Sequence, residues 1–569
     1  MRVALPGVAR SGDGFGFRFD GRDCVGFPGE SLAAALVAGG HMALSTTARG
    51  DGRGVFCGMG VCGECTVRVD GQTRRACMMA AAPGLVVEAM PARAEPAPPA
   101  ALPAAQALAC DVLVIGGGPA GLAAVQALAA TGLDVVVIDE RSRPGGQYFK
   151  QPGAGFAVDP ARLDAQFGEG RALIAAVAAS GARVLAGTLA WAAEAAGDQV
   201  AVHAQGPDGP LRITARRLII AMGAAERPWP MPGWTLPGVM TTGAAQTLLR
   251  SGAVAPGRRV LVAGNGPLNI QLACELLAAG IDVAGLVEQA PWPFTRPAAA
   301  LAMARHDAAL ALAGIGQLAR LARAGVPLLF GHALIAAQGD GRVQRAVAAR
   351  LTAGGLAGER AFAVDALCIG AGFQPQAELA RALGCALGWH DGAAVVVRDD
   401  DGRTSQRHVF VAGDGGGLGG ARAALAQGAL AGLAAAADLG AAADAARVRQ
   451  LQRQLATARG FQAGLWRLFA PAHAAPSVAT AQTMICRCEG VTFGAVDALI
   501  ADGPADAGRI KRATRLGMGR CQGRYCAPLL ANRLAAAAGR PAAADDLYAP
   551  RPPFKPISIA ALAAAADPP

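Results

Sequence analysis

The sequence has little charge, few aromatic side chains and no long uninterrupted apolar run. Charged residues make up 17% of the chain and hydrophobic residues 53%, which excludes a mainly disordered protein. No stretch of about 20 residues is apolar enough for a membrane core, because charged side chains interrupt the most apolar long region, residues 301–336. Residues 1–20 lack the apolar core of a secretory signal. We therefore expect a globular cytoplasmic protein without a transmembrane segment.

The length and the charge balance narrow the class further. A chain of 569 residues is several times longer than a typical domain of about 150 residues, so several domains are expected. The net charge of +10 raises nucleic acid as a partner. The basic segment at residues 509–524 lacks the interleaved aromatic side chains that stack on bases, so we expect no nucleic-acid partner.

Four of the 13 cysteines are concentrated between residues 57 and 77. Their pattern is C-x4-C-x2-C, with a fourth cysteine after eleven further residues, which is typical of plant-type [2Fe-2S] ligation. A structural zinc site is the alternative, but such sites prefer two C-x2-C pairs and this segment has one. The predicted cluster ligands are Cys57, Cys62, Cys65 and Cys77.

A dinucleotide-binding motif follows the Pro/Ala-rich segment at residues 91–109. An apolar strand leads into G-x-G-x-x-G, then a helix and a second strand that ends in acidic residues. The glycines allow pyrophosphate to approach the helix N-terminus, and the acid bonds the ribose hydroxyls. The predicted residues are Gly116, Gly118 and Gly121, with Asp139 as the acid and Glu140 as its alternative.

Three later segments distinguish FAD from NAD at this motif. LIIAMGAAERPWPMPG (218–233), TSQRHVFVAGDGGG (404–417) and RPGGQ (143–147) resemble fingerprints of the two-dinucleotide-binding-domain flavoproteins. The resemblance implies that Asp414 bonds the ribityl chain of FAD and that RPGGQ contacts the flavin. No C-x-x-C pair lies near a glycine loop, which argues against the disulfide-reductase branch. The further FAD residues implied are Gly145, Gly146, Gln147, Gly223 and Gly413.

A second strand, glycine loop and helix unit occupies residues 259–288. It keeps Gly264 and Gly266 but has Asn269 in place of the third glycine, which is expected to push the helix away from the strand. Glu288 would repel a 2′-phosphate, so NAD or another adenine nucleotide is favoured over NADP. A retained fold without an exchangeable nucleotide is the alternative.

A second set of four cysteines lies near the C-terminus. It reads C-x-C, 32 residues and C-x4-C, and resembles the bacterioferritin-associated-ferredoxin-like [2Fe-2S] domain, although that family usually ends in C-x2-C. CRCEGVT with RATRLGMGRCQGRYC also resembles the α subunits of heteromeric amine and amino-acid dehydrogenases. Basic residues between the pairs, Arg515 among them, form either a solvated face or a site for the phosphate of FMN at a subunit interface. The predicted ligands are Cys486, Cys488, Cys521 and Cys526.

The resemblance covers nearly the whole chain, as a ferredoxin-like γ-type domain fused to an α subunit. The relatives include sarcosine oxidase, proline and hydroxyproline dehydrogenases, opine oxidase and hydrogen cyanide synthase. It implies an amine-oxidising FAD-dependent β subunit as partner and a quinone or carrier protein as electron acceptor. No catalytic residue is assigned, since substrate oxidation is expected on the partner. A self-contained NADH-dependent FAD/iron-sulfur reductase and a redox-sensing scaffold are the alternatives.

The predicted fold class is α/β, a Rossmann-like two-dinucleotide-binding-domain flavoprotein with an N-terminal β-grasp ferredoxin domain and a small C-terminal α-helical [2Fe-2S] domain. A flavin between two clusters would split an electron pair into single steps. The expected parts are a ferredoxin-like domain (1–92), a linker (93–109), an FAD-binding domain (110–256 and 372–445), a second dinucleotide-binding domain (257–371), a helical connector (446–480), a second cluster domain (481–545) and an extended tail (546–569).

Overall fold

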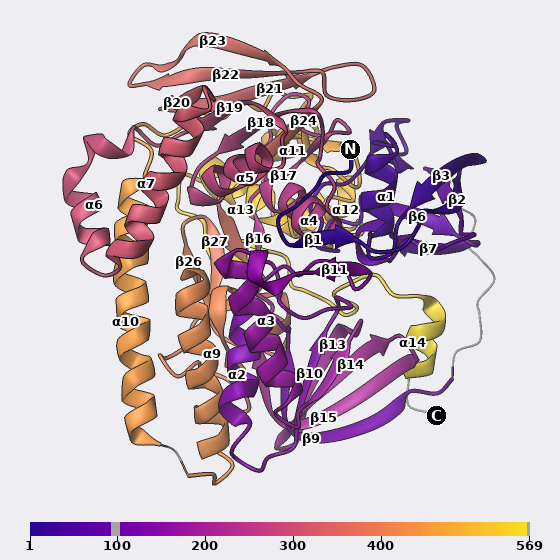
Figure 1. The fold of residues 1–569 in the computed structure, drawn as a ribbon, viewed down its shortest axis with the longest axis vertical. Helices are drawn as coiled ribbons and strands as arrows, with labels where there is room; N and C mark the ends of the chain where they lie inside the picture. Colours follow the sequence, from indigo (N-terminus) through magenta and orange to yellow (C-terminus); the bar gives the residue numbers. More distant parts are fainter. Residues whose placement is uncertain (93–102, 443, 566–569) are drawn as a thin grey trace.

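The computed structural model describes residues 1–92, 103–442 and 444–565 (Figure 1). Most of the expected linker, residues 93–102, lies outside these ranges. The remainder of that segment is not all linker, because strand β9 (Gln106–Ile115) begins inside it and pairs with β15 (Gly209–Ile220). In the described part of the chain, no helix is both long enough and apolar enough to cross a membrane.

The N-terminal domain is a mixed five-stranded sheet packed on one short helix, α1 (Leu32–Ala38). Ser31 caps this helix by accepting a hydrogen bond from the Ala34 N–H at 3.1 Å. Residues 32–37 are all buried, because α1 is also covered by α4 (Thr242–Gly252) of the next domain. The strand order is β3 (Arg22–Gly26), β2 (Phe15–Phe19), β8 (Val86–Ala89), β6 (Thr66–Val69) and β7 (Gln72–Arg75).

A seven-stranded sheet forms the centre of the next domain. Helices α2 (Pro119–Leu128) and α9 (Gly420–Ala437) pack against each other beside it. Their close approach requires a glycine at position 428, because a Cβ there would lie 1.9 Å from the carbonyl oxygen of Ala120. The sheet order is β12 (Arg183–Ala186), β10 (Val135–Asp139), β9, β15, β14 (Gln199–Gly206) and β13 (Leu189–Ala196), with β28 (Val409–Val411) paired to β15.

A second, entirely parallel sheet carries the later glycine loop. Helices α4 and α5 (Pro267–Ala278) pack on it, and their core is continuous with that of the N-terminal domain. A three-stranded antiparallel sheet, β21 (His332–Gln338), β22 (Arg345–Thr352) and β23 (Gly355–Ala363), is inserted before β24. The parallel order is β17 (Val239–Thr241), β24 (Ala366–Gly370), β18 (Arg259–Gly264), β19 (Asp282–Glu288) and β20 (Leu328–Phe330).

The C-terminal part begins with the long helix α10 (Ala445–Leu468), which runs beside α9 (Figure 1). Helix α10 also packs on α6 (Pro297–Ala304). Three short helices follow Cys488 in the chain: α11 (Phe493–Ala501), α12 (Ala507–Thr514) and α13 (Cys526–Ala537).

The tail is not extended throughout, because it ends in helix α14 (Ile559–Ala565) against β15. It wraps its own chain: the Phe554 N–H donates to the Trp191 carbonyl at 2.8 Å. Helix formation in the alanine-rich stretch after Ile559 is consistent with the high helix propensity of alanine.

Candidate functional site

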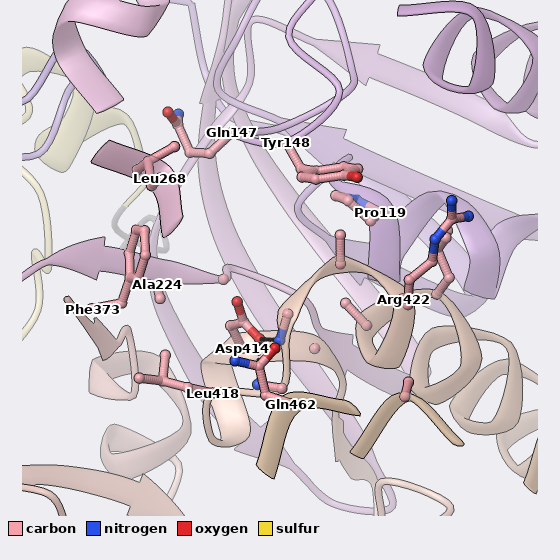
Figure 2. Close-up of a pocket in the computed structure, with 18 of the residues that line it drawn as sticks. Pro119, Gln147, Tyr148, Ala224, Leu268, Phe373, Asp414, Leu418, Arg422 and Gln462 are labelled. Atoms are coloured by element: carbon pink, nitrogen blue, oxygen red, sulfur yellow. Dashed lines mark hydrogen bonds between the residues drawn. The ribbon is translucent and has the colours of Figure 1, made fainter. Parts of the chain in front are cut away.

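A cavity of about 1660 Å³ lies between the seven-stranded sheet, the second glycine loop and helices α6, α9 and α10. Figure 2 shows Gln147, Tyr148 and Asp414 around it, from segments far apart in the sequence. Most of the predicted cofactor-binding residues line this cavity. Those that do not are Gly121, Gly145, Gly264, Glu288 and Arg515.

The first glycine loop fits a bound pyrophosphate at one position in particular. A Cβ on Gly116 would lie 2.5 Å from the Ala221 carbonyl oxygen, and one on Gly121 would lie 1.8 Å from the Gly116 carbonyl oxygen. These two glycines are therefore needed by the protein's own packing. Gly118, the N-cap of α2, has no atom closer than 3.7 Å to such a Cβ, so it leaves an open cradle at a helix N-terminus.

The two candidate acids after β10 have different surroundings. Asp139 accepts from the Gly117 N–H and the Arg141 N–H, both at 2.7 Å, and burial raises its pKa. The carboxylate of Glu140 contacts Lys555 of the tail and lies 4.0 Å from Arg75. Both acids line the cavity, but Asp139 is the one that is fixed to the glycine loop.

The RPGGQ loop packs directly on the first glycine loop. The Gly145 N–H donates to the Gly117 carbonyl at 2.7 Å, and a Cβ on Gly146 would lie 2.7 Å from the Gly118 Cα. Gln147 lines the cavity beyond them. Its carbonyl accepts from the ammonium of Lys150, which the sequence reasoning missed. Burial lowers the pKa of Lys150 to about 7.

Asp414 lies in the short 3-10 helix Gly413–Gly416 that precedes α9, and its Oδ1 accepts from the Gly419 N–H at 2.9 Å and the Gly420 N–H at 3.0 Å. Burial raises its pKa despite these hydrogen bonds. A Cβ on Gly413 would lie 2.8 Å from the Ala120 Cβ, so the Asp414 segment packs closely on α2. Gly223 also lines the cavity, with a positive φ of 70°.

The second glycine loop lines the same cavity through Asn265, Gly266 and Leu268. Glu288, however, is completely buried and is not a lining residue. It accepts from the Gly266 N–H and the Asn265 side chain, both at 2.8 Å, and burial raises its pKa to about 7. Its carboxylate therefore holds the loop together.

Asn269 does not push α5 away from the sheet, contrary to expectation. Its Nδ2 donates to the Gly370 carbonyl at 2.9 Å, and its Oδ1 accepts from the Thr242 hydroxyl at 2.7 Å. The space comes from Gly370, because a Cβ there would lie 2.2 Å from Asn269 Oδ1. A glycine on the neighbouring strand thus replaces the missing third glycine of the motif.

The four N-terminal cysteines lie together, and all but Cys77 are buried. Cys57 Sγ accepts from the Cys62 N–H at 3.3 Å and the Met59 N–H at 3.5 Å. Burial opposes ionisation, but these hydrogen bonds and that from the Cys62 thiol lower the pKa of Cys57 to about 6. Backbone N–H groups directed at the sulfur atoms are what a negatively charged cluster requires.

The four C-terminal cysteines also lie together. Cys488 Sγ is 3.7 Å from Cys486 Sγ and 3.9 Å from Cys521 Sγ, and Cys526 Sγ is 3.8 Å from the Tyr548 hydroxyl. Among the described residues, no group of three or more cysteine, histidine or acidic side chains is placed to hold one metal ion. A [2Fe-2S] cluster instead divides four thiolates between two irons.

The N-terminal cysteine loop lies against both other sites. Met59 and Val61 line the large cavity, and Arg141 Nη2 donates to the Gly58 carbonyl at 3.2 Å. On another side, Cys62 shares a small cavity with all four C-terminal cysteines, none of which lines the large cavity. The expected order, with the flavin between two clusters, is therefore not the spatial order of these sites. Sequence spacing carries no signal for such contacts between domains.

Arg515 lies outside the large cavity and has a left-handed backbone at the end of α12. Its side chain is largely exposed, and its Nε lies 2.9 Å from the carboxylate of Glu489. Two neighbouring arginines have acidic partners as well: Arg509 pairs with Asp502 at 2.8 Å, and the buried Arg524 pairs with Glu378 at 3.0 Å.

Three family models match the chain. The pyridine nucleotide-disulphide oxidoreductase model matches residues 110–428, a 2Fe-2S iron-sulfur cluster binding domain matches residues 13–91, and the sarcosine oxidase A3 domain matches residues 480–566. These matches support FAD and one [2Fe-2S] cluster as cofactors.

Two curated relatives are similar over most of the chain. An opine oxidase subunit of Agrobacterium tumefaciens (strain Ach5) is 35% identical over 470 residues, which are 80% of this chain and 91% of that protein. Hydrogen cyanide synthase subunit HcnB of Pseudomonas aeruginosa is 34% identical over 472 residues, 79% of this chain and 97% of that protein. The crystal structure of L-proline dehydrogenase from P. horikoshii shares the fold, with a TM-score of 0.71, 23% identity and coverage of 97% and 98% of the two chains.

Proposed function

The chain belongs to the pyridine nucleotide-disulphide oxidoreductase family, and from this premise we propose that it is the electron-transfer subunit of a multisubunit amine or amino-acid dehydrogenase. The proposed substrate class is sarcosine, proline or hydroxyproline, an opine, or glycine. An amine-oxidising FAD-dependent β subunit supplies the electrons, and a quinone or a carrier protein removes them. The names of the similar subunits support this proposal.

One observation carries the proposal: the cavity with the flavin fingerprints and the N-terminal cysteine loop share a wall. Met59 and Val61 belong to the cysteine loop and line the cavity, while Arg141, two residues after Asp139, holds the loop at the Gly58 carbonyl. A flavin and a cluster at these sites are neighbours without an intervening domain. This is the arrangement that electron transfer requires.

The chain's residues divide the work of holding FAD. The open cradle at Gly118 receives the pyrophosphate, Asp139 the ribose and Asp414 the ribityl chain, while Gly146 and Gln147 lie beside the ring system. When bound, FAD accepts an electron pair and releases single electrons, which [2Fe-2S] clusters carry one at a time. Lys150, hydrogen bonded to the Gln147 carbonyl and to Gln246 Oε1 at 2.8 Å, fixes the loop.

The finer assignments form part of the same proposal. The C-terminal cysteines hold a second [2Fe-2S] cluster in a domain over residues 481–545, and the loop at Gly264 and Gly266 holds NAD or another adenine nucleotide. Because Glu288 is bonded to the loop and does not line the cavity, it affects the choice of nucleotide only by fixing the conformation of the loop. FMN at a subunit interface near Arg515 requires that this side chain leave Glu489.

The proposal is tested by purifying the chain alone and with its co-purifying partner. The chain alone is expected to bind one FAD and about four irons and to reduce dyes or quinones at most. The complex is expected to oxidise an amine or imino acid with an artificial acceptor. Amino-acid dehydrogenase turnover by the isolated chain would contradict the proposal. Fewer than four irons per chain would show that one of the two proposed clusters is absent.

A second candidate function is a self-contained NADH-dependent reductase. The observation in its favour is that the second glycine loop lines the same cavity as the first. Anaerobic titration with NADH separates the two functions. Rapid bleaching of the flavin absorbance supports the reductase, whereas an unchanged flavin spectrum supports the electron-transfer subunit.

A further inference from the structure

A buried ion pair joins the two cysteine sets. Glu64 lies between Cys62 and Cys65 in the sequence, and Arg487 lies between Cys486 and Cys488. The guanidinium of Arg487 binds the carboxylate of Glu64 through two hydrogen bonds, Nε to Oε1 at 2.6 Å and Nη2 to Oε2 at 2.7 Å. Their side chains are only 5% and 4% exposed.

Aromatic side chains enclose this pair. The Arg487 guanidinium lies 3.7 Å from the ring centre of Phe56 and 4.6 Å from that of Trp234. Phe56 also contacts Tyr525 edge to face, with ring centres 5.4 Å apart. Phe56 directly precedes Cys57, and Tyr525 directly precedes Cys526, so each cysteine set contributes one ring.

The position of the pair is not explained by domain docking alone. Removing two charges from water is costly, and apolar side chains of similar volume often hold such a contact as well or better. Here each charged residue is flanked by cysteines of its own set, and Cys62 shares a small cavity with the four C-terminal cysteines. The contact therefore connects the two cysteine sets through two covalent segments and two short hydrogen bonds.

We propose that the Glu64–Arg487 pair, with Phe56 and Tyr525, is the junction through which electrons pass directly between the N-terminal and C-terminal clusters. The inference rests on the proposed function, in which both cysteine sets hold [2Fe-2S] clusters. One electron crosses at a time: the donor cluster is oxidised by one electron and the acceptor cluster is reduced by one. No bond is made or broken, and no proton is transferred. Electrons thus leave the flavin cavity through the N-terminal set and reach the C-terminal set second.

Glu64 and Arg487 are positioning residues that also set the charge beside each cluster. Replacing Glu64 by glutamine removes a negative charge but keeps the shape, so reduction becomes easier and the midpoint potentials rise. Replacing Arg487 by methionine removes the positive charge and lowers the potentials. Opposite signs are expected from charge, whereas simple loosening of the domain contact would not produce them.

The test uses the full-length holoprotein with its iron content measured. Low-temperature EPR of the dithionite-reduced protein is expected to show magnetic interaction between two clusters, and redox titration gives their potentials. E64Q is expected to keep the interaction and raise the potentials, R487M to weaken the interaction and lower them, and R487K to restore the R487M changes in part. If R487M fails to fold, the potentials and the EPR spectrum of E64Q still decide the result.

A matched control is the bidentate pair of Arg533 and Asp497, which joins α13 to α11 at 2.7 and 2.6 Å on the surface of the same region. D497N is expected to leave the EPR spectrum and the potentials unchanged. Four irons with a spectrum that is the sum of two isolated clusters would overturn the inference while leaving the proposed function intact. So would an E64Q protein with the potentials of D497N. Fewer than four irons would overturn the second cluster itself, and the inference with it.

Discussion

Gly118 and Gly121 separate cofactor binding from protein packing within one motif. A Cβ on Gly118 meets no protein atom closer than 3.7 Å, and its φ of −81° suits alanine, so G118A should fold with a stability within about 0.5 kcal/mol of the parent. The new methyl group would project into the cradle at the start of α2. Losing one hydrogen bond to a charged phosphate costs about 1.5–3 kcal/mol, or roughly a 10- to 100-fold weaker affinity for FAD.

The matched variant is G121A, whose Cβ would lie 1.8 Å from the Gly116 carbonyl oxygen. The backbone must shift, which should cost about 1–3 kcal/mol and lower the melting temperature of the apoprotein. Flavin content after purification, quenching of free FAD fluorescence and thermal unfolding of both apoproteins are the measurements. If G118A binds FAD as the parent does, the pyrophosphate does not sit at this helix N-terminus and the assignment is refuted.

Three further predictions follow from the packing and the burial of particular residues. G428A should destabilise the protein by about 1–3 kcal/mol, because its Cβ would lie 1.9 Å from the Ala120 carbonyl oxygen. The Cβ of G314A, in helix α7 (Ala308–Arg323), would meet no atom within 4 Å, so this variant should be stabilised by about 0.4–1 kcal/mol. Denaturant unfolding measures both changes. Burial lowers the pKa of Lys150 to about 7, below the unfolded value of about 10.4. Between these two pH values the unfolded chain binds more protons than the folded chain, so the stability of the parent protein should rise with pH across this range. The melting temperature of K150M, measured at a series of pH values, should lack that contribution to the rise. C65S should lose about two irons per chain and keep its flavin, whereas C385S, at a buried cysteine outside both sets, should keep all its iron; a C65S protein with full iron content would contradict the N-terminal ligand set.

Local patterns in the sequence predicted the parts of this fold that depend on local geometry. The strand, glycine loop and helix around Gly116 follow from residues close together in the chain. The family of the chain, its oxidoreductase class and the N-terminal [2Fe-2S] domain are confirmed by the family models and relatives. These features depend on turn geometry and ligand spacing, which a single sequence displays.

The failures concern contacts between distant segments. Asn269 was expected to separate helix and strand, yet Gly370, about a hundred positions later, makes room for it. The tail was expected to be extended, but it ends in a helix, and its Lys555 contacts Glu140. Neither partner can be identified from spacing, because each lies in a segment far away in the sequence.

Three arginines are buried around the two cysteine sets. Arg487 is 5% exposed beside both cysteine sets, Arg53 is 3% exposed with its Nε 3.5 Å from the Arg487 carbonyl, and Arg524 is 5% exposed between Cys521 and Cys526 in the sequence. A buried guanidinium favours negative charge nearby, because the low-dielectric interior screens the attraction weakly. Each tetrathiolate [2Fe-2S] cluster would supply about two negative charges at this place. Arg487 and Arg524 are in addition paired with Glu64 and Glu378, so these buried arginines compensate charge inside the chain and are not free to bind a polyanion.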